Sequence, residues 1–144
     1  MAVAVDLVGE LAPEPELSSR PRALARDELE RMASCAAYRL LVGRVDGEIR
    51  GTLTLVVYPL LAEVRARIDD VVVERSATGV AVASALVRQA TALAREAGAR
   101  RLKLTSRPSL VEVNRRYGEL RFDDCGSSVY HLVFEPRDDE SAGP

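Results

Sequence analysis

Residues 65–87 read RARIDDVVVERSATGVAVASALV, and this stretch decides the fold. Its first part, Arg65 to Val73, is rich in β-branched residues and predicts a strand. A short turn from Glu74 to Thr78 follows, and the small residues from Gly79 onward predict a helix. A strand that leads into a helix N-terminus through small residues is typical of an anion site, because backbone N–H groups and the helix dipole both point at the ligand. The stretch therefore predicts a fold built around a nucleotide-bearing cofactor.

The strand in this stretch changes its phase halfway along. Its apolar residues stand first on even and then on odd positions: Val64, Ala66 and Ile68, then Val71 and Val73. A two-residue period cannot change phase without an extra residue, so we expect a β-bulge near Asp69 and Asp70. The alternative is a strand that is buried on both faces from Val71 onward and has no bulge.

Patterns on both sides predict a meander of strands, followed by alternating strands and helices. The further predicted strands are residues 3–8, 38–45, 48–58 and 101–105, with one or more final strands over Phe122 and 128–134. The predicted helices are residues 25–32, 79–97 and 108–120. Asp46-Gly47 predicts a tight hairpin turn. This order favours an α/β fold with a mixed sheet flanked by helices, in one domain over residues 1–135 with an acidic tail over 136–144.

Composition narrows the classes of function. The chain has 144 residues, 47% of them hydrophobic, and a formal net charge of -2. This balance is ordinary for one globular domain and argues against nucleic acid or an anionic membrane as the main partner. The N-terminus lacks the basic and apolar regions of a signal peptide, and we expect no membrane span. Cys35 and Cys125 lie far apart, which fits a reduced cytoplasmic location and leaves a single disulfide open.

These segments, in this order, resemble the GNAT superfamily of N-acetyltransferases from Val3 to Phe134. The family's cofactor motif, Arg/Gln-x-x-Gly-x-Gly/Ala, falls on Thr78, Ala81 and Ala83. Its second motif falls on Ser106-Arg107-Pro108, Asn114, Tyr117, Leu120 and Phe122, with Arg121 in place of the glycine of a Gly-Phe pair. Phrases such as Val45-Asp46-Gly47 are typical of bacterial members. The resemblance implies the GNAT fold, with a twisted mixed sheet whose fourth strand is bulged, and a homodimer.

The resemblance also implies acetyl-CoA as co-substrate. Val71 and Val73 would offer backbone groups to the pantetheine arm, and Asn114 would bind either cofactor or a backbone carbonyl. The N–H groups facing the pyrophosphate would belong to Gly79, Val80, Ala81, Val82, Ala83 and Ser84. Thr78 lacks the charge of an arginine, and Ala81 adds a Cβ where the family has glycine. We expect these changes to weaken coenzyme A binding by roughly tenfold to a hundredfold.

Candidate catalytic groups follow from the same resemblance. Transfer to an amine needs a base and an acid for the departing thiolate. Tyr117 matches the family's usual acid, and the alternative is a buried aromatic residue of the core. Asp69 or Asp70, at the expected bulge, could be the base directly or through water, and the alternative is a solvated or salt-bridged carboxylate beside Arg65 and Arg67. We expect a structural role for His131 and a raised pKa for the Cys125 thiol beside two aspartates.

The sequence therefore favours an N-acyltransferase that moves an acetyl or related acyl group to an amine of a small molecule or peptide. The second hypothesis is a GNAT-fold protein that no longer uses acetyl-CoA. Such a protein would bind a ligand or partner, or catalyse other chemistry on a pathway intermediate. Thr78, Ala81 and Arg121 are the residues that favour this second hypothesis.

Overall fold

The computed structural model describes residues 4–7 and 26–134 of the chain. One sheet holds five strands in the order β1 (Ala4–Leu7), β2 (Tyr38–Val45), β3 (Glu48–Pro59), β4 (Val64–Val73) and β5 (Arg101–Lys103). Neighbouring strands are antiparallel from β1 to β4, and β5 is parallel to β4. The helices are α1 (Arg26–Ser34), α2 (Ala77–Glu96) and α3 (Val111–Glu119). The predicted mixed α/β sheet with flanking helices is confirmed.

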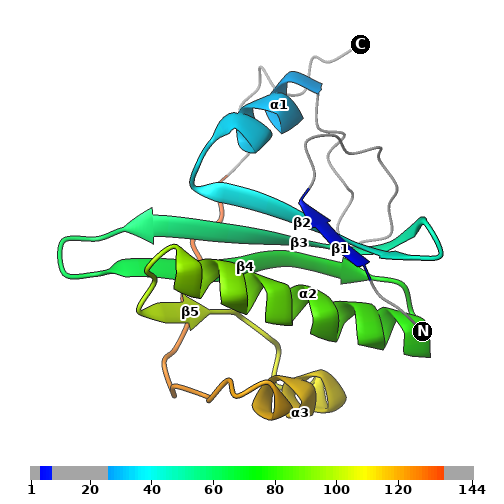
Figure 1. The fold of residues 1–144 in the computed structure, drawn as a ribbon. Coiled ribbons are helices and arrows are strands. Elements are labelled where there is room, and N and C mark those ends of the chain that lie inside the picture. The colour runs from blue at the N-terminus through cyan, green and yellow to red at the C-terminus, as the bar shows by residue number, and fades with distance from the viewer. Residues whose placement is uncertain (1–3, 8–25, 135–144) are drawn as a thin grey trace.

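Helix α2 runs along the sheet and forms the core with it, as Figure 1 shows. Val82 and Leu86 on this helix are completely buried. Val82 stands over Gly43 and Gly51, which are paired across β2 and β3. A Cβ on Gly43 would lie 2.4 Å from a Val82 methyl group, and one on Gly51 would lie 2.9 Å from it. The two glycines therefore let α2 lie close to the sheet.

By length and composition alone, α2 is also a candidate for a membrane-spanning helix, contrary to the expectation that no segment would be. Its apolar side packs on the sheet, where Leu86 and Ala90 are completely buried. We therefore assign α2 as the core helix of this fold.

The predicted β-bulge is present in β4. Thr52 pairs with Val72 and Thr54 pairs with Asp69, so one residue of β3 lies opposite two residues of β4. One of these two, Asp70, has φ of 51°, a left-handed conformation that aspartate tolerates better than most residues. The bulge explains why Ala66 and Ile68 are buried while the apolar positions that follow are shifted by one residue.

Two local turns carry the expected backbone signals. Asp46 and Gly47 both have positive φ, as a type I′ hairpin turn requires, so this predicted turn is confirmed.

Arg121 has φ of 68°, at the position where the family pattern has glycine. A non-glycine residue in this region is strained, so the family's preference for glycine has a structural reason here.

The predicted final strand is wrong. Residues 123–134 form no strand, and all of them are exposed. The apolar side chains in this segment are between 62% and 90% exposed: Val129, Tyr130, Leu132, Val133 and Phe134. The residue types favour a strand, but a strand also needs a neighbour for its backbone groups, and the sequence pattern alone does not supply one.

Element boundaries differ from prediction at several ends. The strand expected to reach Thr105 ends at Lys103, and the helix expected from Pro108 begins at Val111 after a turn. The helix expected over residues 25–32 is α1, which ends at Ser34. The predicted acidic tail over residues 136–144 lies outside the described residues. Cys35 and Cys125 are both free and exposed, so the open disulfide is not formed.

Candidate functional site

A cavity of about 570 Å³ opens beside β4 where its pairing with β5 stops. The two strands pair only over Arg65–Arg67 and Arg101–Lys103, and the chain after β5 then leads away toward α3. The cavity walls come from β4, α2, α3 and residues 104–110. This volume lies within the range of ordinary small-molecule sites. The wedge between the strands is therefore open rather than filled by side chains.

The three predicted catalytic side chains meet at this cavity. Asp69 and Asp70 line it from the bulge of β4, and Tyr117 lines it from α3. Tyr117 lies about fifty residues after the two aspartates in the sequence, so the fold brings together residues that sequence reasoning selected separately. The bulge contributes directly, because two successive residues of β4 border the same cavity.

The two aspartates differ in their partners. The Asp69 carboxylate accepts a hydrogen bond from Arg67 Nε at 2.7 Å, in an exposed ion pair. No partner for the Asp70 side chain occurs among the described residues. The predicted alternative, a salt-bridged or solvated carboxylate, therefore fits both residues, because Asp69 is paired with Arg67 and Asp70 is exposed. Asp70 is thus the carboxylate at the cavity without an ion-pair partner among the described residues, and a catalytic role for either aspartate stays a prediction.

Tyr117 is half-buried, and its ring packs edge-on against Phe122 with the ring centroids 6.1 Å apart. Burial raises the pKa of Tyr117 above its ordinary value, so its phenol stays protonated at neutral pH. In the part of the chain that the structure describes, its hydroxyl has no hydrogen-bond partner. The ring contact fits the alternative of an aromatic residue of the core, and the unpartnered hydroxyl is compatible with the role of acid, which stays a prediction.

The N-terminus of α2 is capped by the chain itself. Ser76 is the N-cap residue, and its hydroxyl oxygen accepts the Gly79 N–H at 3.1 Å. The same hydroxyl donates to the Glu74 carboxylate at 2.8 Å, and Arg50 donates to the other oxygen of that carboxylate at 2.9 Å. The hydrogen bond from Ser76, and then that from Arg50, hold the pKa of Glu74 below its usual value.

The helix begins at Ala77 rather than at the predicted Gly79, and this changes which amides are available. The Val80 N–H already donates to the Ser76 carbonyl at 3.1 Å. From Ala81 onward each N–H has an acceptor one turn back in the helix. The amide donors left in the first turn are those of Ala77 and Thr78. Alanine propagates a helix better than any other residue, so alanines in the motif favour this early start.

The predicted cofactor residues fall into two groups. Five of them line the cavity: Val71, Val73, Val80, Ala83 and Ser84. Gly79, Ala81, Val82 and Asn114 do not line it. Gly79 and Val82 lie on the buried side of α2. A Cβ on Gly79 would lie 1.8 Å from the Glu74 carbonyl oxygen. Gly79 is therefore required by the close approach of the β4–α2 connection.

Asn114 holds the loop before α3 in place. Its side-chain amide donates to the Arg107 carbonyl at 3.0 Å, which is the backbone alternative left open for this residue. The loop so held carries Ser106, whose Oγ is buried and has no hydrogen-bond partner. Ser106 lines the cavity, so a ligand there would give this oxygen the partner that the protein does not supply.

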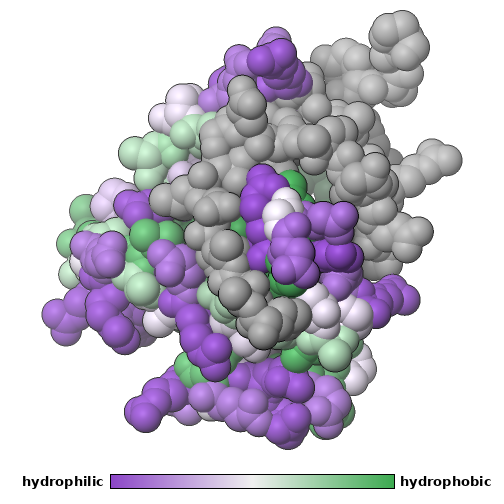
Figure 2. Space-filling model, turned by 45° about the vertical axis from the view of Figure 1, so that its right-hand side comes forward, coloured by the Kyte–Doolittle hydropathy of each residue, from purple (hydrophilic) through white to green (hydrophobic). Residues whose placement is uncertain are grey.

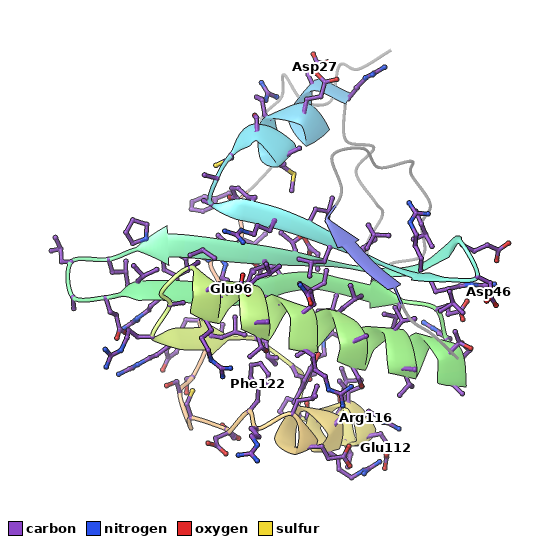
Figure 3. All side chains as sticks on the ribbon, in the orientation of Figure 1. Asp27, Asp46, Glu96, Glu112, Arg116 and Phe122 are labelled. Atoms are coloured by element: carbon purple, nitrogen blue, oxygen red, sulfur yellow. The ribbon has the colours of Figure 1, made fainter. Side chains whose placement is uncertain are left out.

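The cavity also contains residues that sequence reasoning did not select. Arg116 faces it from α3, and Figure 3 shows this side chain on the side of the helix toward α2. The sequence did contain a sign that Arg116 faces inward, because Val113, Arg116 and Leu120 have the spacing of residues on one helix face. Arg107 and Leu104 reach the same cavity from the chain after β5.

The predicted effect on Cys125 is wrong in sign. Its pKa is lowered, chiefly by hydrogen bonds from the side chain and backbone of Ser127, while the charge of Asp124 has a smaller opposing effect. His131 is exposed in the unpaired segment after α3, where it lines no part of the cavity.

The model of the Acetyltransferase (GNAT) family matches residues 5–120. The chain therefore belongs to this family, and it carries the family's acetyltransferase domain. A search of curated proteins found no match.

Solved structures with the same fold come from different sources. A transcriptional regulator from Bacillus halodurans is 25% identical, with 75% of this chain and 73% of that chain covered and a TM-score of 0.67. An acetyltransferase from Trypanosoma brucei is 20% identical, with 92% of this chain and 100% of that chain covered and a TM-score of 0.70. An aminoglycoside acetyltransferase from an uncultured soil metagenomic sample is 14% identical, with 82% of this chain and 78% of that chain covered and a TM-score of 0.69. The last two similarities show the fold alone.

The family generally uses acetyl-CoA, and the cavity suits one part of that molecule. Its walls are largely apolar, with Val71, Val87 and Leu104 among them, and the methylene and methyl groups of the pantetheine arm can pack against them. The buried Ser106 oxygen offers that polar arm a hydrogen bond. The capped start of α2, in contrast, does not present the row of amides expected for a pyrophosphate.

Proposed function

We propose that this protein is an acyl-CoA-dependent N-acyltransferase, most simply one that acetylates an amine of a small molecule or peptide by direct attack. One observation carries the proposal: Asp70 and Tyr117 border a single open cavity along the unpaired half of β4. The family supports the general activity, and we assign Asp70 as the base and Tyr117 as the acid that the transfer needs.

In this proposal each residue has one role. Acetyl-CoA, when bound, supplies an acyl group activated as a thioester. Asp70 accepts the proton of the attacking amine, directly or through water, and Asp69 stays paired with Arg67. Tyr117 donates its hydroxyl proton to the departing thiolate. The largely apolar walls surround the half-buried Tyr117, and they strengthen its interaction with the charge that develops on the sulfur.

We expect coenzyme A to stabilise the protein against heat and acetyl-CoA to release free thiol only when an amine is added. A ligand at about 100 times its Kd stabilises the folded state by about 2.7 kcal/mol. The measurements are melting curves with and without coenzyme A, and thiol release with a panel of polyamines, aminoglycosides and peptides with free N-termini. The double variant Asp70→Asn, Tyr117→Phe is the control, and it should still bind coenzyme A but release no thiol.

The second candidate function is a GNAT-fold protein that no longer uses acetyl-CoA. The capped N-terminus of α2, its early start at Ala77 and the loss of a cation at Thr78 favour it. Unchanged melting curves at millimolar coenzyme A, together with no thiol release for any amine, would establish this alternative in place of the enzyme.

We also propose that the protein forms a homodimer through the segment after α3. Its apolar side chains are exposed, and the outer edge of β5 has no strand partner among the described residues. An open edge in one copy and an unpaired strand-forming segment in another can satisfy each other by strand addition.

Light scattering should then give twice the chain mass of 15.7 kDa for the wild type. Leu132→Glu should shift the protein to monomer, because it places a charge within the contact. Leu61→Glu is the matched control, since Leu61 is also exposed but lies in the turn before β4, and it should stay dimeric. A monomeric wild type contradicts the proposal.

A further inference from the structure

The geometry points to Arg107 and Arg116 as the residues that bind the phosphate groups of coenzyme A, in place of the N-terminus of α2. This inference rests on the proposed function, because it assigns a part of the same cofactor site. It differs from the site expected from the family motif, in which amides at the start of the helix receive the pyrophosphate.

The start of α2 has little left to offer a phosphate. Ser76 occupies the Gly79 N–H, and the Val80 N–H is already bonded within the helix. Thr78, at the motif position for arginine, brings no charge. Arg75 precedes the helix, but it does not line the cavity. A phosphate here would meet two amides and no cation from the cavity wall.

The opposite wall of the cavity carries two cations. Arg116 is half-buried on the face of α3 that also carries Tyr117, and Arg107 lies in the loop that Asn114 ties to α3. Neither guanidinium has a carboxylate partner among residues 26–134. Because a guanidinium presents several N–H donors in one plane, it suits phosphate oxygens well.

Arg115 provides the contrast on the same helix. Its guanidinium is ion-paired with Glu112 at 3.1 Å and with Glu119, and it does not line the cavity. Glu112 lies on the outer side of α3 in Figure 3, and the lower edge of the molecule, where α3 lies, is hydrophilic in Figure 2. The outer face of α3 thus has paired charges, and the inner face has an unpaired cation.

An unpaired cation that is half-buried costs free energy, because part of its hydration is lost. Arg116 stands on a helix face whose other positions, Val113 and Leu120, are apolar. A bound anion would recover this cost. The buried Ser106 oxygen beside Arg107 adds a hydrogen-bonding group to the same wall.

The test compares coenzyme A with pantetheine, which has the same arm but no phosphate. Calorimetry would measure the Kd of both ligands for the wild type and for Arg107→Ala, Arg116→Ala, Arg75→Ala and Arg115→Ala. We expect Arg107→Ala and Arg116→Ala each to weaken coenzyme A by about tenfold and their combination by about a hundredfold. Pantetheine affinity should stay unchanged, and Arg75→Ala and Arg115→Ala should match the wild type with both ligands.

Other outcomes overturn the inference. An equal loss for both ligands in Arg116→Ala would mean that the side chain only shapes the cavity. A selective loss of coenzyme A in Arg75→Ala alone would return the phosphates to the start of α2. If the wild type binds neither ligand, the proposed function itself fails. If every variant binds coenzyme A as well as the wild type does, only this inference fails. Melting curves without ligand check that each variant is folded.

Discussion

Replacing Tyr117 with phenylalanine should lower kcat by about two to four orders of magnitude while leaving the Kd of coenzyme A unchanged. The substitution removes one hydroxyl group that lines the cavity and has no partner in the described part of the chain. The ring contact with Phe122 stays, so the fold of α3 should be preserved. The measurement is kcat from thiol release, together with calorimetry for coenzyme A.

The pH dependence of the same variant separates an acid from a packing residue. Burial raises the pKa of Tyr117, so the proton-donating form persists at neutral pH and is lost only as pH rises through this raised pKa, above about 10. The wild-type rate should therefore fall on the alkaline side, and Tyr117→Phe should lack this fall. Tyr58→Phe is the control, because Tyr58 packs beside Arg67 and lies outside the cavity. An unchanged kcat in Tyr117→Phe would leave Tyr117 with a packing role only.

Much of the site could be predicted because its signals are local or periodic. The phase change in β4 located the bulge, since a two-residue period allows no other simple explanation. The Asp46-Gly47 pair located the hairpin through its need for positive φ. The resemblance selected Tyr117, the predicted bulge selected the two aspartates, and the fold brings these residues to one cavity.

The start of α2 could not be predicted because it depends on distant residues. Ser76 caps the helix while it is held by Glu74, which is held in turn by Arg50 on β3. Propensity also favours a long helix once alanine replaces glycine in the motif. A pattern that treats Gly79 as part of a phosphate loop cannot detect this network.

The cation at Arg116 and the missing last strand illustrate two other limits. Arg116 interrupts an apolar face of α3, which is a visible irregularity, but only the fold shows that this face borders a cavity. Residues 128–134 have the composition of a strand, yet pairing is a tertiary property that composition does not decide.

The second large effect is expected for Gly79→Ala, which should destabilise the protein by about 3 kcal/mol. Glycine to alanine in a helix normally stabilises by about 0.5 to 1 kcal/mol, because alanine loses less conformational entropy on folding. Here the added Cβ would lie 1.8 Å from the Glu74 carbonyl oxygen and 2.8 Å from its carbon. These are backbone atoms, so the connection between β4 and α2 must move.

Gly118→Ala is the matched control, since Gly118 lies within α3 and a Cβ there would have no neighbour within 4 Å. It should stabilise the protein by about 0.5 to 1 kcal/mol, the opposite sign. Urea unfolding would compare the midpoints of both variants at an unchanged m-value. If the two substitutions shift the midpoint in the same direction, the connection between β4 and α2 can move enough to accommodate a Cβ at position 79. Gly79 would then not be required by packing, and binding of an anion by its backbone N–H would become the better explanation for a glycine at this position.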